Sequence, residues 1–161
     1  MSEAKRIIGI DPGLLHTGWG VVDTVGSQKS YVASGVILPP KNDNLPARLS
    51  FIFKGLSTLL DIWKPDCAGI EIIFVNQNPA TTLLLGHARA AAILAVATKE
   101  VPLFEYEPNV IKKAVTGRGH ADKSQIDAMV RALLPNARSS SPDESDALAI
   151  AITHANYFRP I

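Results

Sequence analysis

The sequence is poor in cysteine, in aromatic residues and in net charge. Its single cysteine among 161 residues excludes a disulfide framework and any zinc site built from several thiolates. Aromatic residues make up 6%, and 16 lysines and arginines nearly balance 15 aspartates and glutamates. The near-neutral total gives no sign of a polyanionic partner. We find no apolar run near the roughly 20 residues that a bilayer requires, and we therefore expect no membrane span.

The N-terminal sequence and the length of the chain indicate one cytoplasmic domain. The N-terminal residues MSEAKRIIG lack the apolar core of a signal peptide, which favours the cytoplasm. A chain of this length buries roughly 70% of its unfolded surface on folding and needs no disulfides to do so. No segment is repeated or of low complexity, so we expect residues 1–161 to form a single domain.

Hydrophobic periodicity predicts an α/β fold in the order β-β-β-α-β-α-β-α-α-α. Strands are expected at residues 6–11, 19–24, 31–38, 67–72 and 103–106, and helices at 45–63, 79–99, 110–115, 122–134 and 141–155. The first three strands are spaced like hairpins, whereas the later strands alternate with helices. The five-stranded sheet should therefore be mixed, with three antiparallel strands, further parallel strands and helices on both faces. Asn78 and Asp122 are predicted helix caps, and Ser141 with Glu144 forms a predicted capping box.

Four acidic residues fall where three of these elements would converge. Alternation along the first strand places Asp11 at its carboxyl end, on the face opposite Ile10. Glu71 lies near the carboxyl end of the fourth strand. If these strands are parallel neighbours, the two carboxylates lie side by side at the edge where open α/β sheets bind ligands. Asp143 and Asp146, three residues apart, share one face of the last helix near its N-terminus.

Such a cluster implies a hard cation. An unpaired, half-buried Glu71 would be costly, and neighbouring carboxylates repel one another unless a cation holds them. All-oxygen ligands select Mg²⁺ or Mn²⁺ over zinc, and a pair of such ions would suit phosphoryl chemistry. Taken singly, the acids also have structural explanations. Asp11 precedes Pro-Gly as a turn former, and Asp143 complements a helix dipole.

Short motifs along the chain together resemble the RuvC-type Holliday junction resolvases, which have an RNase H-like fold. In chain order they are IGIDPG (8–13), TGWG (17–20), IEIIF (70–74), LGHAR (85–89), VTGRG (115–119), ADKSQ (121–125) and DESDALAIA (143–151). The resemblance runs from about Arg6 to about Ala155. Other RNase H-like proteins share the opening motif, but the whole set in this order is specific.

The resemblance implies that Asp11, Glu71, Asp143 and Asp146 are the catalytic residues and metal ligands of an endodeoxyribonuclease. It implies Mg²⁺ as the cofactor, with Mn²⁺ able to substitute, and in-line attack of water on a DNA phosphodiester. The implied activity resolves four-way (Holliday) junctions by paired symmetrical nicks during recombination and repair, with a preference for a short thymine-containing sequence. The implied partners are junction DNA, a second copy of the chain and the RuvA–RuvB branch-migration complex.

Five residues in or near these motifs are predicted DNA contacts: Phe74, Arg89, Lys112, Arg118 and Lys123. In the family, an aromatic residue at the position of Phe74 stacks against unpaired bases at the crossover, which is worth about 1–3 kcal/mol per base. A core phenylalanine closing the strand is the alternative. The two lysines would lie near the scissile phosphate, and solvated surface lysines are their alternative. The roles of His120 and His154 stay open. His120 could contact a DNA phosphate, and His154 could support the metal-binding acids from the same helix.

The expected helix at 79–99 is apolar nearly all round and rich in small residues, which favours burial on more than one side. The family favours a dimer seam, and a buried core helix is the alternative.

Three features depart from the family. Gln77 replaces a common lysine, Ile72 replaces a more usual polar residue, and the chain stops at Ile161 without a basic tail. These departures predict weaker junction binding, whereas the four acids are intact.

Two other functions stay open. Another RNase H-like nuclease, of the YqgF type or cutting RNA–DNA hybrids, shares the opening motif, although residues 116–123 argue against it. A non-catalytic junction-binding protein would be expected to have lost one or more of the acids. An actin-like or sugar-kinase ATPase needs two such halves, for which the chain is too short.

Charge is distributed unevenly along the chain. Residues 108–140 carry six basic and two acidic side chains. The near-neutral net charge of the whole chain is therefore the sum of a basic face and an acidic site.

Overall fold

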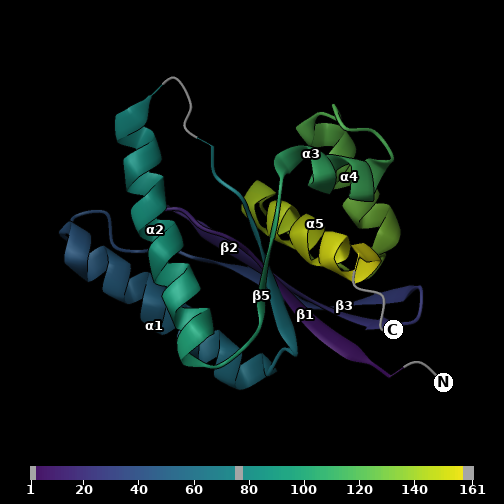
Figure 1. Cartoon of the computed structure of the whole chain (residues 1–161), viewed down its shortest axis with the longest axis horizontal. Coiled ribbons are helices and arrows are strands. Elements are labelled where there is room, and N and C mark those ends of the chain that lie inside the picture. The colour runs from purple at the N-terminus through teal and green to yellow at the C-terminus, as the bar shows by residue number, and fades with distance from the viewer. Residues whose placement is uncertain (1–2, 75–77, 158–161) are drawn as a thin grey trace.

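The computed structural model describes residues 3–74 and 78–157, which form a five-stranded mixed sheet with helices on both faces (Figure 1). The strand order is β3-β2-β1-β4-β5. β1 (Lys5–Asp11), β2 (Thr17–Val25) and β3 (Gln28–Ile37) pair antiparallel, while β4 (Cys67–Glu71) and β5 (Leu103–Tyr106) run parallel to β1. The predicted order of elements and the mixed sheet are confirmed.

The helices divide between the two faces of the sheet. α1 (Leu45–Trp63) and α2 (Pro79–Thr98) lie on one face, and α3 (Pro108–Thr116), α4 (Lys123–Leu133) and α5 (Pro142–Tyr157) lie on the other (Figure 1). β1 divides its side chains accordingly. Ile8 and Ile10 pack with residues of α1 and α2, whereas Ile7 packs with residues of the other three helices. The predicted alternation along β1 is therefore confirmed, and it assigns a face to each strand residue near the site.

Element boundaries differ from the predicted ones where a turn or a neighbouring strand decides them. β2 and β3 extend further towards their shared turn than expected because a two-residue turn with Gly26 at φ +61° lets Val25 pair with Gln28. β2 also begins earlier than expected, because Thr17 and Gly18 pair with the far end of β3. β4 ends at Glu71, although the backbone N–H of Ile72 still donates to the carbonyl of Tyr106 at 2.9 Å. β5 ends at Tyr106, so the ladder goes no further.

Two predicted helix caps are confirmed, and the third has a different geometry. Asn78 accepts a hydrogen bond from the N–H of Thr81, and Asp122 forms a capping box at the start of α4. At the start of α5, the hydroxyl of Ser141 accepts from the N–H of Glu144 at 3.3 Å. The carboxylate of Glu144 accepts from the Ser141 hydroxyl at 2.9 Å and from the N–H of Ser140 at 3.1 Å. The helix is capped, but by a wider serine cluster.

Glycines bring α5 unusually close to the sheet. A Cβ atom on Gly9 of β1 would lie 2.0 Å from the carbonyl oxygen of Ala147, and one on Gly18 of β2 would lie 2.2 Å from that of Asp143. No larger residue fits either position without moving the helix. These contacts therefore fix the distance between the sheet and the first two turns of α5, which carry two of the predicted acids.

α2 packs less completely and corrects one expectation. It has 20 residues, and an 18-residue stretch within it has a mean hydropathy of 1.5, so by length and composition alone it could cross a membrane. The expectation that no segment approaches this length is wrong. Core helices of soluble proteins can have the same length and hydropathy. α2 packs against α1 through Ala88, Ala92, Ala95 and Val96. Its opposite side exposes Leu83 and Leu94.

Candidate active site

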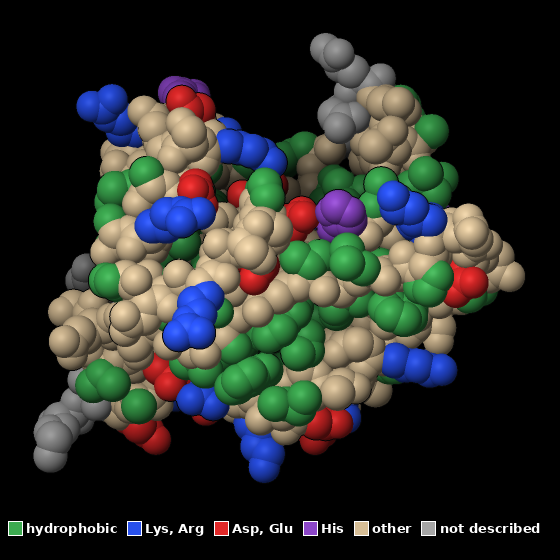
Figure 2. Space-filling model, turned by 180° about the vertical axis from the view of Figure 1, so that it is seen from behind, with side chains coloured by type: hydrophobic (Ala, Val, Ile, Leu, Met, Phe, Trp, Pro, Cys, Tyr) green, Lys and Arg blue, Asp and Glu red, His purple; other side chains and the backbone are tan. Residues whose placement is uncertain are grey.

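A cavity of about 510 Å³ lies at the carboxyl ends of β1 and β4 and is bordered by the first turns of α3, α4 and α5. All four predicted acids line it, together with both predicted lysines: Asp11, Glu71, Asp143, Asp146, Lys112 and Lys123. Figure 2 shows a hollow between two raised parts of the molecule, with acidic side chains around it. The structure thus brings together residues that are up to 135 positions apart in the chain.

Strand register explains why Asp11 and Glu71 meet. β1 and β4 are parallel neighbours, and Ile10 lies opposite Ile70 at the last pair of their ladder. Both isoleucines point to the face of α1 and α2. The next residue of each strand therefore points to the face of α5, where both carboxylates border the cavity. The sequence prediction of two side-by-side strand carboxylates is consistent with this geometry.

Burial and the closeness of the acids to one another raise the pKa values of three of them. Burial, followed by the charges of Asp146, Asp143 and Glu71, raises the pKa of Asp11 to about 7. Burial is also the largest cause that raises the pKa values of Glu71 and Asp146, and the charge of Asp146 adds to the shift of Glu71. These carboxylates repel one another in a partly desolvated place, which is what a bound cation would relieve.

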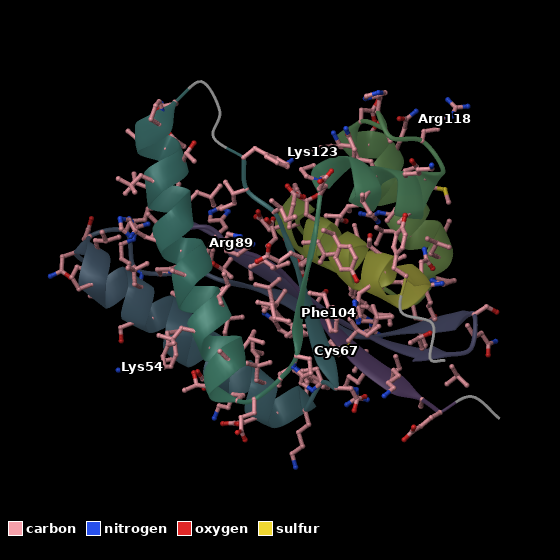
Figure 3. All side chains as sticks on the ribbon, viewed as in Figure 1. Lys54, Cys67, Arg89, Phe104, Arg118 and Lys123 are labelled. Carbon is pink, nitrogen blue, oxygen red and sulfur yellow. The ribbon has the colours of Figure 1, made fainter. Side chains whose placement is uncertain are left out.

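The two lysines partly offset this repulsion. The Nζ atom of Lys123 lies 3.6 Å from Oδ2 of Asp146, and its charge acts to lower the pKa of that carboxyl. The charge of Lys112 acts in the same direction on Glu71. Figure 3 shows Lys123 on the side of α3 and α4 that faces α2. The side chain is 81% exposed, so it is free to meet a phosphate beside the acids.

The donor set fits a hard divalent cation, although the side chains do not yet surround one. Within residues 3–74 and 78–157, no three His, Cys, Asp or Glu side chains are arranged to hold a metal ion as they stand. Carboxylate oxygens are nevertheless the ligands that Mg²⁺ and Mn²⁺ prefer, and all four acids border one cavity. A cation bound there would be held by carboxylates of β1, β4 and α5.

A second pocket of about 300 Å³ adjoins the acids between β4 and α2, and it shares Asp11 and Glu71 with the first. Phe74 lines it with 59% of its surface exposed, so its interpretation as a core residue is wrong. Arg89 also lines it, but this side chain is engaged within the protein. Its Nε donates to the carbonyl of Glu71 at 3.2 Å, and its Nη2 lies 3.0 Å from a carboxylate oxygen of Glu105. Arg89 therefore braces the end of β4.

Three other residues do not line the cavity of the acids. Arg118 is exposed at the outer end of α3 and α4, away from Lys123 and Arg89 (Figure 3). His120 is exposed in the same loop and is absent from the cavity wall. His154 is buried, and its Nδ1 forms a hydrogen bond with the hydroxyl of Tyr106 at 2.5 Å, which makes it a packing residue between α5 and β5. Gln77 lies outside the described residues.

Two contacts at the start of α5 could not be predicted from the sequence. His16, in the loop after β1, places its Nδ1 atom 3.1 Å from Oδ2 of Asp143. Glu144 is only 5% exposed, and serine hydroxyls from β3 and from the loop before α5 donate to its carboxylate, including that of Ser34 at 2.9 Å. Burial acts to raise the pKa of Glu144, but the hydrogen bonds from Ser34, Ser141 and Ser140 outweigh it and lower the pKa. No local spacing signals either contact, because the partners are more than 100 residues apart.

Comparisons with known proteins identify the family and the fold. The sequence profile described as "Crossover junction endodeoxyribonuclease RuvC" matches residues 7–154. The proteins of that name from Bartonella henselae and Caulobacter sp. are 48% and 50% identical to the chain. The alignments cover 98% and 94% of this chain and 93% and 89% of theirs. The solved structure of Thermus thermophilus RuvC in complex with a Holliday junction substrate superposes with a TM-score of 0.88 at 30% identity, covering 95% of this chain and 94% of that one. The mixed sheet and its flanking helices are thus an RNase H-like fold, and the chain belongs to the RuvC family of crossover junction endodeoxyribonucleases.

Proposed function

We propose that this chain is a metal-dependent endodeoxyribonuclease that resolves four-way DNA junctions by paired, symmetrical nicks, and that residues 1–161 act as one nuclease domain. The observation that carries the proposal is the convergence of Asp11, Glu71, Asp143 and Asp146 on one cavity, with Lys112 and Lys123 beside them. Family membership over residues 7–154 supports the reaction, and the likeness to a RuvC chain solved with a Holliday junction supports the substrate.

In this proposal, the four acids are the catalytic metal ligands. RuvC nucleases are metal-dependent, and we propose Mg²⁺ as the cofactor, with Mn²⁺ able to replace it. A divalent cation held there would polarise the scissile phosphate and lower the pKa of an attacking water. The raised pKa of Asp11, about 7, supports this assignment, because a cation would return that carboxyl to its charged form.

The DNA contacts follow from the distribution of charge and exposure around the cavity. Lys112 and Lys123 border the acids and would bind the phosphates on either side of the cut. Phe74, exposed at the end of the neighbouring pocket, would stack on a base displaced at the crossover. Arg89 and Arg118 would contact DNA less directly, because Arg89 is engaged by Glu105 and Arg118 lies outside the cavity.

Two opposed nicks require two active sites, and α2 offers a surface for a second copy. Leu83 and Leu94, exposed by 65% and 59%, lie eleven residues apart, which is three helical turns along one face. Ala90 lies between them on the same face and is also exposed. An apolar stripe of this kind on a chain with a two-fold substrate favours a homodimer.

The cellular setting is proposed from the family. DNA as the substrate supports a cytoplasmic location without a membrane role, and junction resolution supports action together with the RuvA–RuvB branch-migration complex. The departures at Gln77 and Ile72 support weaker junction binding than is usual in the family.

The test uses a labelled four-way junction, a linear duplex of the same sequence and an RNA–DNA hybrid. Each is incubated with Mg²⁺, with Mn²⁺ or with a chelator. We expect paired cleavage of the junction with either metal, little cleavage of the linear duplex, and none with chelator. Equal cutting of the duplex or the hybrid would support a general RNase H-like nuclease instead. Tight junction binding without cleavage under every condition would support the non-catalytic alternative.

A further inference from the structure

His16 occupies a place beside the acids that the proposed catalytic set leaves unexplained. Its Nδ1 atom lies 3.1 Å from Oδ2 of Asp143, a distance at which an imidazole N–H donates to a carboxylate. The contact joins the loop after β1 to the first turn of α5. The imidazole is 51% exposed and the aspartate side chain 29% exposed. The pair therefore lies at the rim of the cavity and not in the core.

The loop that carries His16 is held in place on both sides of the histidine. The hydroxyl of the buried Thr17 donates to the carbonyl of Gly13 at 2.8 Å and accepts from its N–H at 3.1 Å. Arg48 of α1 donates to the carbonyl of Leu14 at 2.6 Å. With these three hydrogen bonds, the loop presents His16 to α5 in a defined direction.

The backbone of Asp143 is equally constrained, so only the rotation of its side chain is left to be set. Gly18 lets β2 approach the carbonyl of Asp143 so closely that a Cβ atom would lie 2.2 Å from it. Asp143 also borders the cavity that contains the other acids. Oδ2 is engaged by His16, which leaves Oδ1 outside that hydrogen bond.

We propose that His16 is a positioning residue that donates Nδ1–H to Asp143 and holds its carboxylate in the orientation that receives a divalent cation. The inference rests on the proposed function, because it assigns Asp143 to the metal site. Hydrogen bonds to metal-ligating carboxylates fix ligand orientation, and their loss commonly weakens metal affinity by about 10–100-fold. His16 is half exposed, so the lower end of that range applies.

The experiment measures Mn²⁺ binding to DNA-free protein by calorimetry and by electron paramagnetic resonance. His16→Ala and His16→Phe both remove the donor, the second while keeping a ring. His16→Asn keeps an N–H donor at a similar distance from the backbone. We expect the two donor-free variants to bind Mn²⁺ about 10-fold more weakly and His16→Asn to bind within about twofold of the unmodified protein. Leu15→Ala, an exposed change in the same loop, is the matched control, and thermal unfolding confirms that every variant is folded.

Two results would overturn the inference. Unchanged Mn²⁺ binding in His16→Ala and His16→Phe would show that Asp143 needs no such support. Equal weakening in His16→Asn would show that the loss comes from packing and not from the hydrogen bond. Asp143→Asn and Asp146→Asn separate this failure from failure of the proposed metal site. If these two variants bind Mn²⁺ weakly while His16→Ala does not, only the role of His16 is wrong. If they bind it normally, the metal site itself is wrong.

Discussion

α5 and α2 are both long, apolar helices, but they are buried very differently. α5 is buried almost continuously from Glu144 to His154, whereas only four residues of α2 are buried. α5 is pressed onto β1 and β2 through glycines, which fixes the height of Asp143 and Asp146 over the sheet. α2 leaves Leu83 and Leu94 exposed. α5 is therefore constrained along the segment that carries Asp143 and Asp146, whereas α2 keeps an exposed apolar face, which we propose as the contact with a second copy.

Among these changes, the greatest loss of activity is expected at Asp146, which we propose as a metal ligand at the N-terminal end of α5. Asp146→Asn keeps the shape of the side chain but removes the charge of this proposed ligand, so junction cleavage should fall at least about 1000-fold. Junction binding should be retained, because Lys112 and Lys123 are unchanged. Cleavage rates and gel-shift affinities measure the two effects, and Asp61→Asn on α1, outside the cavity, is the control. Cleavage at an ordinary rate would remove Asp146 from the catalytic set.

The close packing of α5 is tested at Gly9. Gly9→Ala should lower the free energy of unfolding by about 3 kcal/mol, because the added Cβ would lie 2.0 Å from the carbonyl of Ala147. Denaturant titration gives the value. Gly119→Ala is the matched control, since its added Cβ meets nothing within 4 Å. A loss below about 0.5 kcal/mol in Gly9→Ala would mean that α5 lies farther from the sheet than described.

The exposed side of α2 is tested at Leu94. Leu94→Glu should weaken self-association by about 2 kcal/mol, or roughly 30-fold, by placing a charge in an apolar contact. Sedimentation equilibrium measures the change. Val25→Glu, at an exposed residue of the β2–β3 hairpin, should leave association unchanged. Equal dimerisation of Leu94→Glu and the unmodified chain would rule out this face of α2 as the seam.

The smallest effect concerns stability and pH. The pKa of Asp11 in the folded state, about 7, lies above its ordinary value of 3.8. The folded state therefore binds a proton that the unfolded state releases, and the metal-free chain should gain stability as pH falls from 8 towards 5. Asp11→Asn should remove much of this gain and stabilise the metal-free chain at pH 8 by about 1 kcal/mol. Chemical unfolding at several pH values in the presence of a chelator gives the comparison. A metal-free chain that loses stability between pH 8 and 5 would contradict the assigned pKa shift.

The sequence predicted most of the fold because the governing signals are local. Alternation along β1, Asn78 as a helix cap and the Asp122–Gln125 capping box all act within a few residues, and all three are confirmed. Boundaries were missed where a turn or a neighbouring strand decides them. β4 ends at Glu71 because β5 ends beside it, and no pattern within β4 contains that information.

The cluster of acids was predictable because the position of each acid along its own strand or helix could be predicted from the sequence. The strand end of Asp11 and the helical spacing of Asp143 and Asp146 were sufficient to predict a cluster. The contacts of His16 with Asp143 and of Ser34 with Glu144 were not predictable, because each joins residues more than 100 positions apart. Arg89 shows the same limit, since its engagement by Glu105 depends on how α2 lies against β5.

Cleavage of a supercoiled plasmid that extrudes a cruciform tests most directly whether this chain resolves a four-way junction by paired nicks. Two nicks made in one encounter give linear DNA, whereas a single nick releases the supercoiling, collapses the cruciform and leaves a nicked circle. We predict that linear DNA is the main product in the presence of Mg²⁺ and that a plasmid without the cruciform is left intact. Accumulation of nicked circles, or equal cutting of the plasmid without a cruciform, would contradict paired resolution of a four-way junction.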